Sequence, residues 1–322
     1  MTQHTRTVRA AAVQMQSQNG LIEANLEHAV GLVEQAAEKG AALVLLPEFV
    51  PTGYEMTSAI WDAAEPRVGT TVNWLKDNSR RLNVWLGTSF LEADGEDFFN
   101  TFVLTAPDGQ EAGRVRKQTP AVWEAFFTKG DPGPHVIQTE LGKIGVGICY
   151  ENLLSYLPQM LYRQSVDMVL MPHSAPMPTR NPLCSAAYLE FYHDTQLSDC
   201  ARRSAHLLGV PAVMANKCGL WQTPLPAPFP PQDSTFPGLS AIADSDGMVE
   251  AQLGDEEGII VKDVTLEPSR KPHTPPQSVG RWAIHVPWQA RAFRVLEVVG
   301  GLWYLLSVER KTNARRVSSA GD

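Results

Sequence analysis

The chain has 322 residues, of which 43% are apolar, and it carries a formal net charge of −8 at neutral pH. This length permits one large α/β domain or two smaller ones, and the apolar fraction is enough for a sizeable core. The acidic balance argues against a nucleic-acid backbone as the partner.

The N-terminal part of the chain alternates between strand and helix patterns. Strands are predicted over residues 8–15, 42–46 and 84–90, and the second is apolar throughout, which is typical of a strand buried on both faces. Helices are predicted over 22–37, where apolar residues recur at helical spacing, and over 70–81. This alternation favours βαβ units.

Two hairpins are predicted in the middle of the chain. Residues 100–105 and 111–116 flank a Pro-Asp-Gly turn. Residues 136–139 and 144–148 flank a Leu-Gly-Lys turn in the same way. Both pairs would add strands to the expected sheets.

The second half of the chain repeats the alternation. Helices are predicted over about 153–164 and over most of 188–208. Strands are predicted over 167–171, 211–216, 240–243 and 258–261. The segment VLMPHS at 169–174 also resembles VLLPEF at 44–49, which either two related halves or chance similarity between apolar strands would explain.

Two proline-rich stretches mark the remaining organisation. Residues 222–237 are expected to form a loop over a site or an interface. We expect one domain over 1–266, followed by a proline-containing linker and C-terminal tail over 267–322. The apolar stretch 295–308 is too short and too interrupted for a membrane span. The longer stretch 286–308 fits an arm at an oligomer interface, with a membrane-surface helix as the alternative.

The cysteines and the N-terminus indicate the compartment. The four cysteines, at positions 149, 184, 200 and 218, form no CxxC pair and no small disulfide framework. Residues 1–9 are polar and lack the apolar core of a signal peptide. We therefore expect reduced thiols in a cytoplasmic protein.

Three functional side chains each follow a predicted strand: Glu48, Lys117 and Cys149. Strand ends are where α/β sheets bind ligands, so these groups are expected to converge. Cys149 lies at a predicted strand-to-helix turn, the setting of a nucleophile elbow. Glu48 would act as general base and Lys117 would stabilise developing negative charge. Each alone also has an ordinary interpretation: a buried thiol, a helix-start carboxylate and a solvated lysine.

The surroundings of these residues resemble the carbon–nitrogen hydrolase family, also called the nitrilase superfamily, over roughly residues 7–265. The resemblance rests on LLPEF at 45–49, RK at 116–117, GICYEN at 147–152, VPAV at 210–213 and SAIAD at 240–244. It implies a four-layer α-β-β-α sandwich and an enzyme without a cofactor. It also implies a homodimer or larger homo-oligomer.

The resemblance also implies a Glu–Lys–Cys catalytic set, here Glu48, Lys117 and Cys149. A second family glutamate fixes the lysine, and Glu124, seven residues after Lys117, matches it best. The alternative for Glu124 is a surface carboxylate.

Aromatic residues near the expected catalytic groups are candidates for substrate contacts. Tyr54, Trp123 and Tyr150 would form apolar pocket walls, and His173 would line the pocket at the end of a strand. Ordinary core packing is the alternative for all of them. The chain shows no P-loop, no HExxH and no zinc-type Cys/His spacing, so no metal is expected.

The expected reaction is hydrolysis of a small-molecule nitrile to a carboxylic acid and ammonia through a cysteine thioimidate and thioester. Glu151 and Asn152 after the cysteine favour the nitrilase branch, whereas Tyr150 replaces the tryptophan usual there. The alternatives are an amidase acting on an amide or carbamoyl substrate, an acyltransferase with an amine acceptor, and a non-catalytic scaffold.

Overall fold

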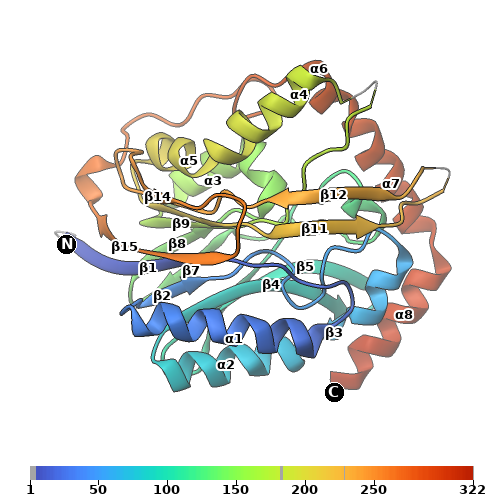
Figure 1. Ribbon diagram of the computed structural model, residues 1–322, viewed down its shortest axis with the longest axis horizontal. Helices are drawn as coiled ribbons and strands as arrows, with labels where there is room; N and C mark the ends of the chain where they lie inside the picture. The colour runs from blue at the N-terminus through green and yellow to red at the C-terminus, as the bar shows by residue number, and fades with distance from the viewer. Residues whose placement is uncertain (1–4, 182–183, 228, 322) are drawn as a thin grey trace.

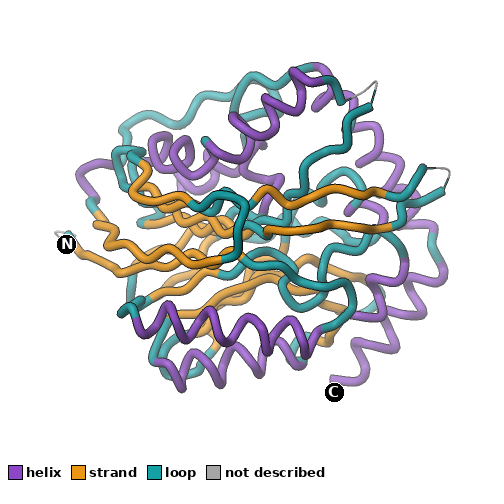
Figure 2. The backbone as a smooth tube through the Cα atoms, viewed as in Figure 1, coloured by secondary structure: helices purple, strands orange, loops and turns teal. Residues whose placement is uncertain are grey.

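A computed structural model describes residues 5–181, 184–227 and 229–321 of the chain. Its layers stack in the order helices, sheet, sheet, helices (Figure 1). Figure 2 shows the strands in the middle of the molecule and most helices at its periphery. The predicted α-β-β-α sandwich is therefore confirmed.

The first sheet contains the N-terminal strands. Its order is β15 (Gly258–Leu266), β1 (Arg6–Gln14), β2 (Leu43–Leu45), β4 (Trp85–Asp94), β5 (Asp97–Thr105) and β6 (Glu111–Arg116), and β3 (Glu65–Pro66) pairs with β4. Strands β1, β2 and β4 run parallel, whereas β4, β5 and β6 are antiparallel neighbours. The predicted strands and the first hairpin are thus confirmed.

The second sheet has a similar arrangement. Its order is β14 (Val249–Gln252), β13 (Ala241–Ala243), β10 (Ala212–Ala215), β9 (Met168–Pro172), β8 (Gly142–Val146) and β7 (Val136–Thr139). The central strands β8, β9 and β10 run parallel, and β7 and β8 form the second predicted hairpin. The segments 44–49 and 169–174, which resemble each other in sequence, therefore cover equivalent central strands, β2 and β9.

The alternation of side chains along the strands fixes the layers. In β2, Leu43 and Leu45 enter the core between the two sheets, while Val44 packs with the outer helices. The helices α1 (Ile22–Glu38) and α2 (Thr70–Leu82) cover the first sheet, and α3 (Tyr156–Gln164) and α5 (Cys200–Leu208) cover the second. The short 3-10 helices are η1 (Ser58–Ala63), η2 (Glu124–Phe126), η3 (Cys149–Leu153), η5 (Pro268–Arg270) and η6 (Ser319–Gly321).

The prediction that most of 188–208 is helical is confirmed, and the structure divides this stretch into α4 (Ala186–Glu190), the π-helix η4 (Phe191–Ser198) and α5. A π-turn leaves the composition unchanged, so apolar spacing does not reveal it.

The stretch 222–237 is not a loop throughout, because β11 (Cys218–Thr223) and β12 (Gln232–Pro237) pair as a two-stranded sheet. Prolines, which cannot donate ladder hydrogen bonds, concentrate in the turn between the two strands. Residue 228 of this stretch lies outside the described residues.

The C-terminal segment folds back along the same chain (Figure 1). It contains α6 (Trp288–Ala292), α7 (Arg294–Leu306) and α8 (Val308–Ser318). The Tyr304 hydroxyl accepts a hydrogen bond from the Phe98 backbone nitrogen at 2.8 Å, and the Trp303 ring stacks on Trp61. Within the described residues, no helix has the length and apolarity needed to cross a membrane.

Candidate active site

The ends of the two equivalent strands meet between the sheets. The backbone nitrogen of Glu48 donates to the carbonyl of His173 at 3.2 Å. In return, Ser174 donates from its backbone nitrogen to Glu48 Oε2 at 2.8 Å and from its hydroxyl to the Glu48 carbonyl at 2.5 Å. The segment after β9 thus fixes the orientation of the Glu48 carboxylate.

Cys149 occupies the turn between β8 and η3, as the sequence predicts. Its φ of 52° lies in the left-handed region, which a non-glycine residue adopts at a cost. Asn152 holds this turn, because its side-chain nitrogen donates to the carbonyls of Gly147 at 2.8 Å and Cys149 at 3.0 Å. The strained backbone is therefore held by specific contacts.

A buried carboxylate, Glu151, joins this turn to the segment that carries Lys117. It accepts hydrogen bonds from the backbone nitrogens of Ile148 at 3.2 Å and Gln118 at 2.7 Å. Its Oε1 also contacts His135 Nε2 at 3.0 Å and Tyr156 Oη at 2.5 Å. Burial alone would raise the pKa of Glu151, but His135 and the hydrogen bonds lower it, so the carboxylate stays ionised.

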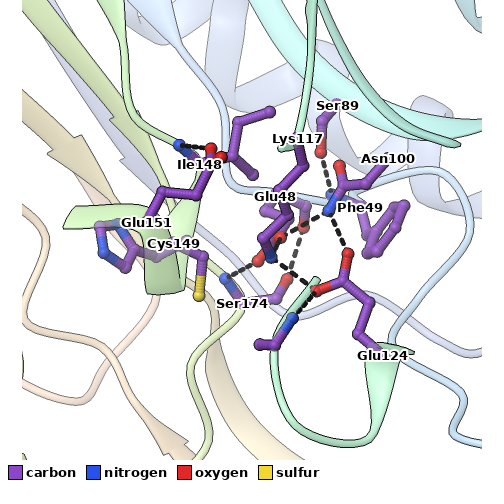
Figure 3. Close-up of polar contacts among 12 residues, drawn as sticks. Glu48, Phe49, Ser89, Asn100, Lys117, Glu124, Ile148, Cys149, Glu151 and Ser174 are labelled. Atoms are coloured by element: carbon purple, nitrogen blue, oxygen red, sulfur yellow. Dashed lines mark hydrogen bonds and ion pairs between the residues drawn. The ribbon is translucent and has the colours of Figure 1, made fainter. Parts of the chain in front are cut away.

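Lys117 and two glutamates form a fully buried ion cluster (Figure 3). Lys117 Nζ lies 2.8 Å from Glu48 Oε1 and 2.6 Å from Glu124 Oε2. Asn100 Nδ2 bridges both carboxylates, at 2.7 Å from Glu48 Oε1 and 2.9 Å from Glu124 Oε1. The structure therefore brings Glu48, Lys117 and Glu124 together, and Glu124 is not a surface carboxylate.

The electrostatics of this cluster assign charges to its members. Burial alone would lower the pKa of Lys117, but Glu124 and Glu48 raise it well above its usual value, so the amine is an ammonium. Burial also raises the pKa of Cys149 well above that of a free thiol, and the Glu48 charge adds to this effect. The resting sulfur is therefore a protonated thiol.

Cys149 opens onto a cavity of about 560 Å³. Its sulfur lies beside the Ser174 backbone nitrogen, on the same side as the Glu48 carboxylate (Figure 3). The predicted wall residues Tyr54, Trp123, Tyr150 and His173 all line this cavity, as does part of the stretch 222–237. Burial lowers the pKa of His173 to about 4, so this side chain is neutral at pH 7.

Sequence reasoning missed several residues of the site. Asn100 lies within an apolar strand, and no pattern distinguishes it, whereas Ser174 closely follows the end of β9, where the strand-end rule would have found it. Lys217 is fully buried and donates from Nζ to the Phe49 carbonyl at 2.8 Å. It follows the end of β10 closely, as Glu48 follows β2, so the strand-end rule would have found it.

The C-terminal segment also reaches the site. Tyr150 donates from its hydroxyl to Glu297 Oε1 at 2.6 Å, and Arg281 binds the other oxygen of that carboxylate at 2.6 Å. Phe293 and Leu296 line the cavity. Among the described residues, no cluster of His, Cys, Asp and Glu is arranged to hold a metal ion.

Comparisons with known proteins show which family and which proteins this chain is similar to. Residues 9–271 match the carbon-nitrogen hydrolase family. A nitrilase of Pyrococcus abyssi is 31% identical over 175 residues, which cover 53% of this chain and 66% of that protein. An N-carbamoylputrescine amidase of Solanum tuberosum is 27% identical over 279 residues, which cover 83% of this chain and 89% of that protein.

The fold is also shared with a solved structure. The crystal structure of a carbon-nitrogen hydrolase from Helicobacter pylori G27 matches with a TM-score of 0.70 at 21% identity, covering 82% of this chain and 91% of that chain. The nitrilase match spans just under two thirds of its relative's length, whereas the amidase match spans most of its relative.

Proposed function

The chain belongs to the carbon–nitrogen hydrolase family, and we propose that it hydrolyses a nitrile to a carboxylic acid and ammonia with Cys149 as nucleophile. The observation that carries this proposal is the buried Lys117 ammonium, held between Glu48 and Glu124 beside a thiol that lines a cavity. A charge, a base and a nucleophile in this arrangement serve acyl chemistry.

The first step is attack of sulfur on the nitrile carbon. Because the Cys149 thiol rests protonated, a base must remove its proton, and we assign this role to Glu48, whose carboxylate lies on the same side as the sulfur. The carbon–sulfur bond forms as one carbon–nitrogen π bond breaks. The nitrile nitrogen takes a proton, and the product is a thioimidate.

Two water additions complete the reaction. Glu48 activates the first water, the tetrahedral adduct breaks its carbon–nitrogen bond, and ammonia leaves behind a thioester. A second water attacks the thioester, the carbon–sulfur bond breaks, and the acid leaves with the thiol restored. Lys117, with the backbone N–H of Tyr150, stabilises the charge on the tetrahedral adducts, and Glu124 fixes the lysine.

An amide substrate is the second candidate. The observation that favours it is the match to an amidase over 83% of this chain, together with Tyr150 after the nucleophile. An amide would enter at the tetrahedral step, lose ammonia and form the same thioester. Both substrates therefore require the same residues.

The proposal also includes the cellular compartment and the oligomeric state of the protein. The four cysteines are free thiols, which supports a reducing compartment and a cytoplasmic enzyme. The α7 helix leaves an apolar face exposed, which supports a homodimer or larger homo-oligomer.

Ammonia release from matched nitrile and amide pairs tests the proposal. We expect nitrile turnover by the wild-type protein and none by Cys149→Ala, with circular dichroism showing that the variant is folded. Amide turnover without nitrile turnover would replace the nitrilase assignment with the amidase. Full activity in Cys149→Ala would contradict both.

A further inference from the structure

The cavity beside Cys149 has an uncharged wall. None of the described residues that line it is an Asp, Glu, Lys or Arg. Aromatic side chains dominate the wall, among them Trp123, Tyr188, Tyr192, Trp221 and Phe293. Burial raises the pKa of both Tyr188 and Tyr192, so these hydroxyls stay neutral.

The charged groups that contact Glu48 and Tyr150 already have partners. Lys117 is paired with the carboxylates of Glu48 and Glu124, so its positive charge is already balanced. The Glu297 carboxylate binds Arg281 and the Tyr150 hydroxyl. His173, which lines the cavity, is held by the Met171 carbonyl at 3.0 Å. A charged group on a substrate would therefore find no counter-ion among the described residues that line the cavity.

The wall includes the C-terminal segment. Phe293 and Leu296 lie beyond residues 9–271, the part of the chain that matches the family. The π-helix η4 contributes another part of the wall, including the neutral side chain of Gln196. A volume of about 560 Å³ accommodates a ligand much larger than a short aliphatic nitrile.

We infer that this site selects nitriles or amides whose acyl group is bulky, uncharged and aromatic or otherwise apolar, and that the C-terminal segment is part of this selection. The inference rests on the proposed hydrolysis at Cys149. Its physical basis is the cost of moving a charged group from water into a cavity that offers it no partner. Apolar contact with the aromatic wall favours the neutral substrate.

A series of three substrates tests the selection by charge. The substrates share one reacting group and differ only in a phenyl, carboxylate or ammonium group at the far end. We expect kcat/KM for the phenyl substrate to exceed both others by at least about 100-fold. Charged and neutral substrates turned over within threefold of each other would overturn the inference and leave the hydrolysis intact. Absence of turnover and of any Cys149 adduct with all three would instead overturn the proposed function.

A charge-reversal pair at one wall position provides the matched control. Gln196→Glu should raise the preference for the ammonium over the carboxylate substrate, and Gln196→Lys should reverse that preference. Because both variants change the same side chain, a general loss of folding cannot produce opposite shifts. If neither variant changes the ratio of kcat/KM between the ammonium and the carboxylate substrate, the wall at this position does not select by charge, and the inference is contradicted.

Phe293→Ala tests the part played by the C-terminal segment. We expect a rise in KM for the phenyl substrate of about tenfold, with a much smaller change for a short aliphatic nitrile. An equal fall in kcat for both substrates would indicate a merely structural role and would overturn this part of the inference.

Discussion

Two buried lysines near the site have different partners, and as a result their amines have different pKa values. Lys117 lies between two carboxylates, which raise its pKa. Lys217 donates to the Phe49 carbonyl and lies near the Phe236 ring, and burial lowers its pKa to about 7 although the Glu48 charge acts in the opposite direction. Lys117 is therefore a permanent cation, whereas Lys217 titrates near neutral pH. Since Phe49 follows Glu48 directly, Lys217 supports the segment that carries this carboxylate.

The pKa of Lys217 predicts a pH-dependent stability. The unfolded chain keeps this proton up to about pH 10.4, whereas the folded chain releases it near pH 7. Between these values the unfolded state binds more protons, so folding becomes more favourable as pH rises. Relative to Lys217→Met, the wild-type free energy of unfolding should therefore increase from pH 7 to 9, by up to about 1.4 kcal/mol per pH unit.

Urea unfolding at pH 7, 8 and 9 measures this effect. The exposed Lys262→Met is the control, and its difference from wild type should not change over this range. A difference between wild type and Lys217→Met that is independent of pH would show that the buried amine does not titrate as expected.

At the residue scale, the sequence predicts functional groups that follow strands and misses those that support them. Glu48, Lys117 and Cys149 stand out because each follows the end of a predicted strand. Asn100 and Ser174 reach the cluster only because distant strands pack together, at sequence separations that local patterns do not register.

At the scale of elements, the site depends on a close approach at the end of β8. A Cβ added at Gly147 would lie 2.2 Å from Asn152 Oδ1 and 2.7 Å from Leu157 Cδ2. Asn152 holds the carbonyls on both sides of the turn, so a displaced Asn152 would release the geometry of Cys149. The helix predicted over 153–164 begins at Tyr156, because Leu153 ends the 3-10 helix η3 and two residues connect η3 to α3.

Gly147→Ala tests the importance of this turn. We expect a loss of about 1–3 kcal/mol in the free energy of unfolding from overpacking, with a fall in kcat larger than any change in KM. Thermal unfolding and steady-state kinetics measure both effects. The control is Gly31→Ala in α1, where an added Cβ meets nothing within 4 Å and helix propensity predicts a small gain in stability. Equal behaviour of the two variants would contradict the account.

At the scale of the whole molecule, the alternation of strands and helices predicts βαβ units and the family resemblance implies the four layers, but neither predicts the path of the C-terminal segment. Some of its apolar residues contact the rest of the chain, and others are exposed. Tyr304 and Trp303 pack on the same chain, and Phe293 and Leu296 line the cavity. The opposite face of α7 is apolar and exposed, and it includes Val295, Val298, Val299, Leu302, Leu305 and Leu306. Spacing alone does not tell which face meets the chain itself.

The exposed face of α7 predicts the oligomeric state. Light scattering should give the mass of a dimer or larger assembly for the wild-type chain. Val298→Glu with Leu302→Glu should reduce this mass to that of a monomer, because these side chains are 55% and 56% exposed in the single chain. Met248→Glu, at an exposed position away from α7, is the control. An unchanged mass in the double variant would exclude this face as the interface.

The central claim is that Cys149 forms the acyl-enzyme, and a mass measurement tests it most directly. The protein is incubated with an aromatic nitrile, quenched in acid and mapped by peptide mass spectrometry. We predict an acyl adduct on the peptide that contains Cys149 in the wild-type protein, less abundant in Glu48→Gln because the base that removes the thiol proton is lost, and absent in Cys149→Ala. Cys184 and Cys200 line the same cavity, so the map discriminates between thiols. An adduct on either of these, or turnover with no adduct on Cys149, would contradict the account.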